Sequence, residues 1–364
     1  MKEKSYSYPL NTDWSTEEII TVVTFYQSVE QAYEKGISRD ELFMRYQAFK
    51  VIVTAQSEEK QLSKQFEAVS GYSIYQVTKK VKDLQKTVSF RWGHDRGGCI
   101  MNQTYHNYYI QVESFLRGLR SELLQRAEDS YKIYQKTSKL DIVTEVDREV
   151  EQKIIDFIYG LAPEDGIVGE ESFFIENNIK SAKRNMWYID PIDGTINFVC
   201  QKKNFAISVA YYEEQVGKIA WIYDVCRDRL YGAIQNEGAH INGIPIPIPK
   251  DRPIEESLVA VAARTLYYLE ENPTQVRKRR IYDALGFRAY GVSTLQMMGV
   301  ATGELGCYIS KQLSPWDYAA GLIILKEVGV LISDFHLSPP TLNEMKNSSL
   351  ICATPKIYHQ LFSL

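Results

Sequence analysis

The chain has 364 residues, of which 45% are hydrophobic and 24% charged, a balance typical of a globular protein and not of a disordered one. A chain of this length can bury one large core and one small one. Lys and Arg number 42 against 46 Asp and Glu, so the net charge is -4 and no basic surplus is available for a phosphate backbone. We therefore do not expect nucleic acid as the primary ligand.

The cysteines and the N-terminal residues predict a reduced, cytoplasmic protein. The five cysteines are odd in number, widely spaced and never in a C-x-x-C pair, which argues against a disulfide framework and against a zinc site. The first residues lack the apolar segment of a signal peptide, and no apolar run reaches the length of a membrane span. We expect no membrane association.

Residues 1–88 are expected to form a small all-helical domain. Ser15 and Glu18 have the spacing of a capping box, in which each side chain accepts a hydrogen bond from the other residue's backbone N–H, and Ser38 and Glu41 repeat this spacing. Apolar residues recur every three or four positions after each box, as on one face of a helix. We interpret the Tyr and Phe side chains of these faces as core and not as a ligand groove.

Two shorter helices are predicted after Ser57 and Ser73, and a linker over residues 89–103 should follow them. The stretch 86–100 has no periodicity and contains three glycines. We hypothesise that residues just before Met101 are the translation of a ribosome-binding sequence, so that the chain is a fusion of two neighbouring reading frames. The nucleotide sequence at this junction tests the hypothesis, which needs a purine-rich run there.

Residues 104–364 are expected to form a second domain that contains both helices and strands. A long amphipathic helix is predicted from Tyr105 to about Ala127. An extended segment, a helix and an antiparallel meander should follow, at residues 141–144, 147–159, 205–212, 217–223 and 229–234. Beyond residue 253, strands and helices alternate at 258–262, 293–302, 307–309, 315–328 and 330–332. The fold class is therefore α+β passing into α/β.

The run W-Y-I-D-P-I-D-G-T at residues 187–195 contains the candidate catalytic centre. Asp190 and Asp193 flank a proline directly after a predicted strand, so both carboxylates can face one cavity. If a helix begins next, the backbone amides of Gly194 and Thr195 have no partner within that helix and can bind an anion. A carboxylate pair beside an anion site is typical of a centre that binds metal ions and phosphate.

Taken alone, D-P-I-D-G is also the pattern of an ordinary Asx and proline turn. Three further acidic segments favour the metal site: D-I-V-T-E-V-D at 141–147, G-E-E-S at 169–172 and S-P-W-D-Y-A-A-G at 314–321. Hard divalent cations held by carboxylates activate water, stabilise a leaving oxygen and neutralise phosphoryl charge. The two residues between the acids of the D-P-I-D run differ from the D-x-D-x-T of aspartyl-phosphate phosphatases. This spacing favours metal ligands over a carboxylate nucleophile.

These four segments, in this order and at this spacing, resemble the inositol monophosphatase family of lithium-sensitive, magnesium-dependent phosphatases. The resemblance covers residues 101–364, including G-A-H-I-N-G at 238–243 and G-V-S at 291–293. It implies a layered αβαβα sandwich of the inositol monophosphatase/fructose bisphosphatase type, here preceded by the helical unit. Residues 1–88 resemble a small uncharacterised family of bacterial helical proteins.

The resemblance also implies a set of metal ligands. Glu170, Asp190 and the backbone carbonyl of Ile192 would hold the magnesium ion that activates water. Asp190, Asp193 and Asp317 would hold a second ion beside the leaving oxygen. A third, weakly held ion is expected near Glu170, and lithium is expected to inhibit.

Further positions of the family's site match residues of this chain. Thr195 and Asp147 resemble the pair that orients the attacking water, and the amides of Gly194 and Thr195 would bind the phosphate. The remaining matches, to substrate-contacting or other site positions, are Ser293, Lys136 and Glu171. No covalent intermediate is implied.

One position departs from the family's pattern. In members that hydrolyse inositol phosphates, an acidic residue seven positions before the W-D aspartate contacts the inositol hydroxyls, whereas this chain has Ser310 there, followed by Lys311. A serine still forms hydrogen bonds, but it is shorter and uncharged, and a lysine favours a second anionic group. Inositol is therefore in doubt as the substrate, and fructose 1,6-bisphosphate and adenosine 3',5'-bisphosphate stay open.

The sequence thus predicts a magnesium-dependent phosphomonoesterase that acts on a small phosphorylated polyol, sugar or nucleotide, in a form compatible with a homodimer. An alternative is an interaction protein that acts through the helical unit or the phosphatase surface. Some bacterial relatives of the family are similar to regulators of transcription or ribosome assembly, which keeps this alternative open.

Overall fold

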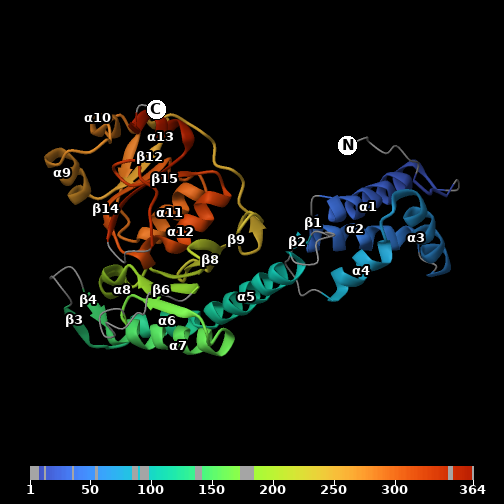
Figure 1. Cartoon of the computed structure of the whole chain (residues 1–364), viewed down its shortest axis with the longest axis horizontal. Helices are drawn as coiled ribbons and strands as arrows, with labels where there is room; N and C mark the ends of the chain where they lie inside the picture. The colour runs from blue at the N-terminus through green and yellow to red at the C-terminus, as the bar shows by residue number, and fades with distance from the viewer. Residues whose placement is uncertain are drawn as a thin grey trace. The chain divides into compact units, whose positions relative to one another are not determined.

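The computed structural model describes residues 8–11, 14–34, 37–53, 56–83, 89–90, 98–135, 142–172, 184–342 and 347–362. It divides into two compact units, Met1–Thr104 and Tyr105–Leu364, and the division falls within helix α5 (Gly98–Gly118) (Figure 1).

Four helices run through the described part of the first unit: α1 (Thr16–Glu34), α2 (Arg39–Ile52), α3 (Gln56–Ser70) and α4 (Ile74–Asp83). The first begins with the predicted capping box, since Ser15 Oγ accepts from the Glu18 N–H at 3.3 Å and Glu18 Oε2 accepts from the Ser15 N–H at 2.8 Å. Phe25, Tyr26 and Phe49 are fully buried, which confirms that the aromatic faces of these helices form a core.

The structure differs from the expected all-helical unit and linker in two respects. Strand β1 (Ile37–Ser38) pairs with β2 (Ser89–Phe90), so the first unit also contains a short antiparallel pair that includes the start of the expected linker. Helix α5 begins at Gly98 and not near Tyr105, because the residues between them include no proline and no second glycine to stop it. The predicted long helix is also divided at Leu119 into α5 and α6 (Arg120–Glu128), directly after the helix-weakening Gly118.

A seven-stranded sheet forms the first framework of the second unit, in the order β11-β10-β9-β8-β7-β6-β5. Its strands are β5 (Gly166–Gly169), β6 (Asn185–Asp193), β7 (Ala206–Glu213), β8 (Val216–Asp224), β9 (Arg229–Ile234), β10 (Ala239–Ile241) and β11 (Ile244–Pro245). The predicted meander corresponds to β7, β8 and β9, and only β5 runs parallel to its neighbour, β6.

A five-stranded sheet forms the second framework, in the order β13-β12-β14-β16-β15. Its strands are β12 (Leu258–Val261), β13 (Gly286–Arg288), β14 (Cys307–Leu313), β15 (Leu331–Ser333) and β16 (Ser348–Ala353). Strand β12 runs parallel to β13 and β14, whereas β16 is antiparallel to β14 and β15. A separate short pair joins β3 (Ile133–Gln135) to β4 (Ile142–Thr144).

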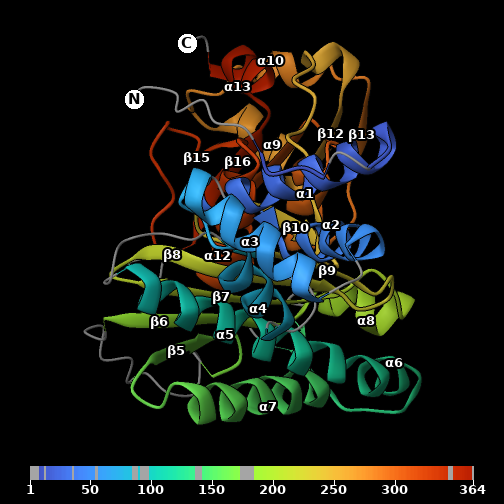
Figure 2. The ribbon, with the colours of Figure 1, turned by 90° about the vertical axis from the view of Figure 1, so that its right-hand side faces the viewer.

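Helices cover both sheets in three layers. Helices α5, α6 and α7 (Glu145–Leu161) cover one face of the large sheet. Helices α11 (Ser293–Ala301) and α12 (Pro315–Glu327) lie between the sheets. Helices α9 (Ala263–Glu271), α10 (Lys278–Ile281) and α13 (Pro355–Phe362) cover the outer face of the small sheet. Side chains alternate accordingly, because Trp187 and Ile189 of β6 pack with α5 to α7 whereas Tyr188 packs with the central helices. Figure 2 shows these layers in order from α7 to α13, which confirms the αβαβα sandwich.

Within the ranges that the structure describes, no helix combines the length and the apolar character needed to cross a bilayer. Four cysteines, Cys200, Cys226, Cys307 and Cys352, are free thiols.

Candidate active site

The end of β6 turns two of the predicted acids toward the same side of the large sheet. Asp190 is paired with Ser208 of β7 and Asp193 with Ala206, so a step of three residues in β6 matches a step of two in β7. This mismatch is a β-bulge. Without it, residues three apart in a strand point to opposite faces. With it, both carboxylates lie on the face whose core includes Ala206 and residues of α11 and α12.

A bulge, and not an Asx or proline turn, lies at Pro191. The strand predicted before Asp190 continues to Asp193, and the register passes over Pro191 and Ile192 without pairing them. Proline lacks an N–H, so a bulge is a place in a central strand where it does not remove a ladder hydrogen bond. The Ile192 N–H donates to Asp190 Oδ1 at 3.1 Å, which fixes the Asp190 carboxylate at the bulge.

Asp190 lies within the field of three other predicted acids. Burial raises its pKa well above the ordinary value, and the charges of Glu170, Asp193 and Asp317 raise it further. A hydrogen bond between the side chains of Glu170 and Asp190 acts in the same direction. The structure therefore brings these four carboxyl groups together from the ends of β5 and β6 and from the start of α12.

Asp193 is held against the N-terminus of α11. Its Oδ1 accepts from the Ser293 N–H at 3.2 Å, and its Oδ2 accepts from both the N–H and the hydroxyl of Thr294 at 2.6 Å. Burial raises the pKa of Asp193 to about 6, while the bonds from Thr294 oppose the rise. Ser293 thus contacts the site through its backbone, and the sequence did not single out Thr294.

Thr195 and Asp147 meet although 48 residues separate them in the chain. The Thr195 hydroxyl lies 3.1 Å from Asp147 Oδ1 and 3.1 Å from the carbonyl oxygen of Ile192, and its single proton can be donated to either. Asp147 is only 1% exposed, and this burial raises its pKa to about 6 against the opposing hydrogen bonds from Thr144. The pair predicted to orient water is therefore in contact.

Asp147 and Asp317 each occupy the first turn of a helix. The Thr144 N–H donates to Asp147 Oδ2 at 2.8 Å at the start of α7, and the Ser314 N–H donates to Asp317 Oδ2 at 2.7 Å at the start of α12. In each case one carboxylate oxygen caps the helix, and in Asp147 the other oxygen faces Thr195. The spacing Thr144-x-x-Asp147 is a capping pattern that the sequence interpretation missed.

Gly194 separates β6 from α8 (Thr195–Gln201) and has a conformation that only glycine adopts without strain. Its φ is +93°, and a Cβ at this position would lie 2.8 Å from Val292 Cγ2 and 3.2 Å from the carbonyl oxygen of Asn204. The sharp change of direction places Thr195 at the first position of α8.

Glu170 directly follows β5, and the segment that carries it is held by Glu151 of α7. The N–H groups of Glu171 and Ser172 donate to the two carboxylate oxygens of Glu151 at 2.8 and 2.7 Å. Glu151 lies one helical turn after Asp147, a spacing that places both on one face of α7. The sequence interpretation named Glu171 as a site residue but did not name Glu151. Buried Glu171 contributes its backbone to this contact.

Two further site positions were predicted, Ser310 and Lys136. Ser310 lies on β14, where its side chain and that of Ser293 both form hydrogen bonds with the hydroxyl of Tyr308. Ser310 is thereby connected to the start of α11. Lys136 lies outside the described residues.

The acids fit magnesium by their chemistry. Among the residues that the structure describes, no three Asp, Glu, His or Cys side chains converge as a formed metal cage. Both oxygens of Asp193 face α11 instead, and one oxygen of Asp317 faces Ser314. The charged groups that act on Asp190 are the carboxylates of Glu170, Asp193 and Asp317, and Mg²⁺ prefers carboxylate oxygens as ligands. A divalent cation relieves the mutual repulsion that raises the pKa of Asp190.

Two family models match successive parts of the chain. Residues 106–363 match the inositol monophosphatase family, and residues 5–89 match an uncharacterised protein family (UPF0223). These matches confirm the resemblance of each part.

Relatives and solved structures match the second part. Inositol-1-monophosphatase of Bacillus subtilis (strain 168) is 36% identical over 251 residues, which cover 69% of this chain and 93% of that protein. Nus factor SuhB of Escherichia coli (strain K12) is 30% identical over 231 residues, which cover 63% and 84%. A structure of inositol monophosphatase II from Staphylococcus aureus MSSA476 is 31% identical, with a TM-score of 0.60 over 70% of this chain and 93% of that one.

Two further solved structures, of SaIMPase-II bound to inositol monophosphate and to 2'AMP, are 30% identical to this chain. Their TM-scores are 0.59 and 0.60, and the matches cover 70% of this chain and 91% and 92% of theirs. The family model, the relatives and the fold agree over the same residues that form the carboxyl cluster. The chain therefore belongs to the inositol monophosphatase family and is a phosphoric monoester hydrolase.

Proposed function

We propose that the protein is a Mg²⁺-dependent phosphomonoesterase that hydrolyses a small phosphorylated polyol, sugar or nucleotide with water as the nucleophile. The observation that carries the proposal is the bulge of β6, which turns Asp190 and Asp193 to the face where Glu170 and Asp317 also act. The four acids come from three places in the chain, and two of them, Asp190 and Asp193, are buried. Their repulsion lowers stability unless a cation neutralises them.

Two magnesium ions would be held by the ligands that the family resemblance implies. Glu170, Asp190 and the carbonyl of Ile192 would bind one ion, and Asp190, Asp193 and Asp317 the other, with a third, weaker ion near Glu170. When bound, the ions make water nucleophilic and neutralise the charge that develops on the phosphoryl group and the leaving oxygen. Structures of relatives in complex with Mg²⁺ and with LiCl support the metal dependence and the expected inhibition by lithium.

The protein's own residues would orient the water and receive its proton. The 3.1 Å contact lets Thr195 pass its hydroxyl proton to Asp147 Oδ1 while it accepts the proton of the attacking water. The new P–O bond would form as the ester P–O bond breaks, and the leaving oxygen would take a proton from solvent. Asp147 would then release its proton to solvent, so that one water is consumed for each phosphate and alcohol released. The amides of Gly194 and Thr195, with Ser293, would contact the phosphate.

Two observations bear on which phosphate ester is the substrate. Inositol monophosphate and 2'AMP are bound by SaIMPase-II, which supports both polyol and nucleotide monoesters as substrates. Ser310 replaces the acid expected for inositol recognition, which favours a substrate other than inositol 1-phosphate.

The full-length Asp193→Asn variant tests the mechanism. Loss of this carboxylate should reduce phosphate release by at least about 100-fold, because a metal ion that neutralises phosphoryl charge would lose one of its ligands. Release is measured with Mg²⁺ on inositol 1-phosphate, fructose 1,6-bisphosphate, adenosine 3',5'-bisphosphate and NADP, and repeated with EDTA and with lithium. The exposed Asp251→Asn is the control. Equal turnover by Asp193→Asn and the control contradicts the proposal.

A second candidate, regulation through protein contacts, is favoured by the similarity to Nus factor SuhB. The test uses a strain that lacks the gene for this protein. If the role is regulatory, the inactive Asp193→Asn variant should restore the phenotype of that strain. If the role is enzymatic, only the wild type should restore it. Restoration by the wild type alone argues against the regulatory candidate.

A further inference from the structure

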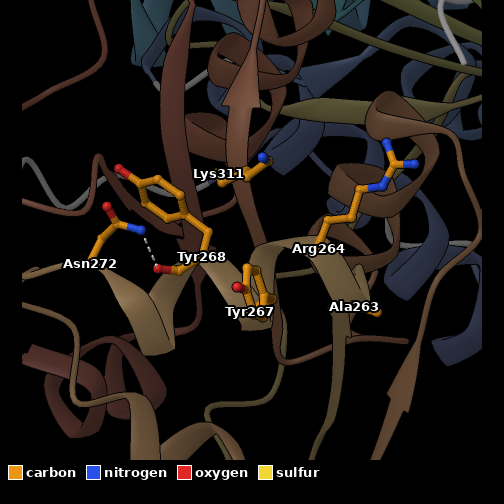
Figure 3. A pocket seen from close by; sticks show the side chains of 6 residues that line it. All are labelled: Ala263, Arg264, Tyr267, Tyr268, Asn272 and Lys311. Carbon is orange, nitrogen blue, oxygen red and sulfur yellow. Dashed lines mark hydrogen bonds between the residues drawn. The ribbon is translucent and has the colours of Figure 1, made fainter. Parts of the chain in front are cut away.

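A cavity of about 420 Å³ lies between α9 and β14 (Figure 3). It is lined by Ala263, Arg264, Tyr267, Tyr268, Asn272 and Lys311, and we call it the Arg264–Lys311 pocket. Its walls are fixed, because the Lys311 N–H donates to the buried Thr265 hydroxyl at 3.3 Å and Asn272 Nδ2 donates to the Tyr268 carbonyl at 2.8 Å. The volume lies in the range of small-molecule sites.

The pocket is connected to the proposed active site through β14. Lys311 directly follows Ser310, the position expected to contact the substrate. The Tyr308 hydroxyl forms hydrogen bonds with the side chains of Ser310 and Ser293, and the Ser293 N–H donates to Asp193. Lys311 lies where the register of β14 shifts, between Ser310 and Leu313, so these contacts lead from the carboxyl cluster to the end of the strand that carries the pocket.

The pocket is lined by two cationic side chains, Arg264 and Lys311. In the part of the chain that the structure describes, neither Arg264 nor Lys311 forms an ion pair with a carboxylate. Lys311 Nζ lies 5.7 Å from the centroid of the Tyr268 ring, a cation–π contact that orients the ammonium group. Figure 3 shows the side chains of Lys311 and Arg264 both extending toward the upper right of the view, above the Tyr267 ring. In a protein of net charge -4, this local positive charge points to an anionic ligand.

We infer that the Arg264–Lys311 pocket is a subsite for a second anionic group of the substrate, an inference that rests on the proposed phosphatase function. The planar guanidinium of Arg264 binds two phosphate oxygens at once, and Lys311 adds a compact positive charge. The rings of Tyr267 and Tyr268 supply an apolar wall for the part of the substrate that joins its two anionic groups. The enzyme therefore prefers bisphosphorylated sugars or nucleotides to monophosphates.

The test compares matched substrates in the full-length enzyme with Mg²⁺. One pair is fructose 1,6-bisphosphate and fructose 1-phosphate, and the other is adenosine 3',5'-bisphosphate and adenosine 3'-monophosphate. In at least one pair the wild type should have a higher kcat/KM for the bisphosphate than for the monophosphate. Lys311→Met should lower the ratio of these two kcat/KM values about tenfold, mainly by raising KM for the bisphosphate. Arg264→Gln, at an exposed position, should act in the same direction, and exposed Lys250→Met is the control.

Each outcome bears on one proposal. A changed ratio in the fructose pair identifies a sugar substrate, and a changed ratio in the adenosine pair identifies a nucleotide. The subsite is overturned if the ratio of kcat/KM for bisphosphate to monophosphate is the same in Lys311→Met, Arg264→Gln and Lys250→Met. This outcome leaves the phosphatase proposal in place. A wild type that releases phosphate from none of the four substrates overturns the subsite, whereas the wider substrate panel and Asp193→Asn test the phosphatase.

Discussion

Glu151 holds the segment that carries a predicted metal ligand. Glu151 is 2% exposed, and its carboxylate accepts hydrogen bonds from the two N–H groups that follow Glu170. The approach is so close that a Cβ at Gly169 would lie 2.5 Å from the Glu151 carboxyl carbon, so Gly169 admits no side chain there. The placement of Glu170 therefore depends on a residue outside the proposed ligand set, as is usual for metal sites.

We expect Glu151→Gln to lower kcat/KM, or the apparent affinity for Mg²⁺, by about 10- to 100-fold. Glutamine keeps one acceptor oxygen, so one of the two N–H groups loses its partner and the segment shifts. Glu149→Gln is the matched control, because Glu149 lies on the same helix with its side chain 49% exposed. Steady-state phosphate release over a magnesium titration measures the effect. Activity within twofold of the control would contradict this role.

The buried Asp147 should make stability depend on pH in the metal-free protein. Burial raises its pKa to about 6, above the value of about 3.9 in an unfolded chain. The folded state therefore binds the proton more tightly, and the stabilisation from this group is complete below pH 4 and lost as the pH rises through 6. The free energy of unfolding of the wild type, minus that of Asp147→Asn, should fall by on the order of 3 kcal/mol from pH 4 to 7. Urea denaturation in EDTA measures the difference, and parallel curves for the two proteins would argue against it.

At the scale of elements, the active site depends on how β6 ends. The bulge sets the direction of Asp190 and Asp193, and Gly194 then turns the chain so that Thr195 opens α8 against Asp147. A regular strand followed by an ordinary residue would separate these groups. The geometry of the strand end is thus as necessary as the identity of the acids.

Gly194→Ala should reduce both stability and activity. Gly194 has a φ of +93° and an alanine Cβ there would meet Val292 Cγ2 at 2.8 Å. The positive φ costs about 1 kcal/mol for alanine, and the contact adds to this cost. Gly238→Ala is the matched control, because Gly238 has a φ of +84° and no atom within 4 Å of the added Cβ. Chemical denaturation and kcat of both variants separate the two effects, and equal losses in both would exclude the contact as a cause.

At the scale of the whole molecule, the two units have separate cores. The core of the first unit includes Phe25 and Phe49, whose ring centroids lie 4.6 Å apart, and it contains only residues of that unit. The three cores of the second unit, with the carboxyl cluster, lie within Tyr105–Leu364. Damage to one core should therefore leave the chemistry of the other intact.

Phe25→Ala should destabilise the first unit by about 3 to 5 kcal/mol, since it empties a fully buried aromatic site. Calorimetry of the full chain should show one transition lowered and a second unchanged, and phosphate release should match the wild type. Tyr75→Ala is the control, because Tyr75 on α4 is 63% exposed. A fall in phosphate release that parallels the lost stability would show that the units depend on one another.

Sequence patterns predicted most elements because their causes are local. The strands β7 and β8 were predicted where the structure has them, and both are buried on both faces over most of their length. The capping box at Ser15 was predicted from the three-residue spacing to Glu18 alone. The break at Leu119 and the early start of α5 were missed, since both depend on small differences in helix stability. The β1–β2 pair was missed because it joins segments about 50 residues apart through two residues each.

The sequence by itself determined the family, the acids and the class of reaction, because the residue types and spacings of Asp190, Asp193 and the other segments carry that chemistry wherever they fold. Only the tertiary structure decided the bulge of β6, the contact of Thr195 with Asp147, the bond of Asp193 to Thr294 at 101 residues' distance, and the pocket beside Ser310. The physical reason is that a local pattern fixes a strand or a helix, whereas register and the meeting of distant side chains follow from burying both faces of two sheets at once.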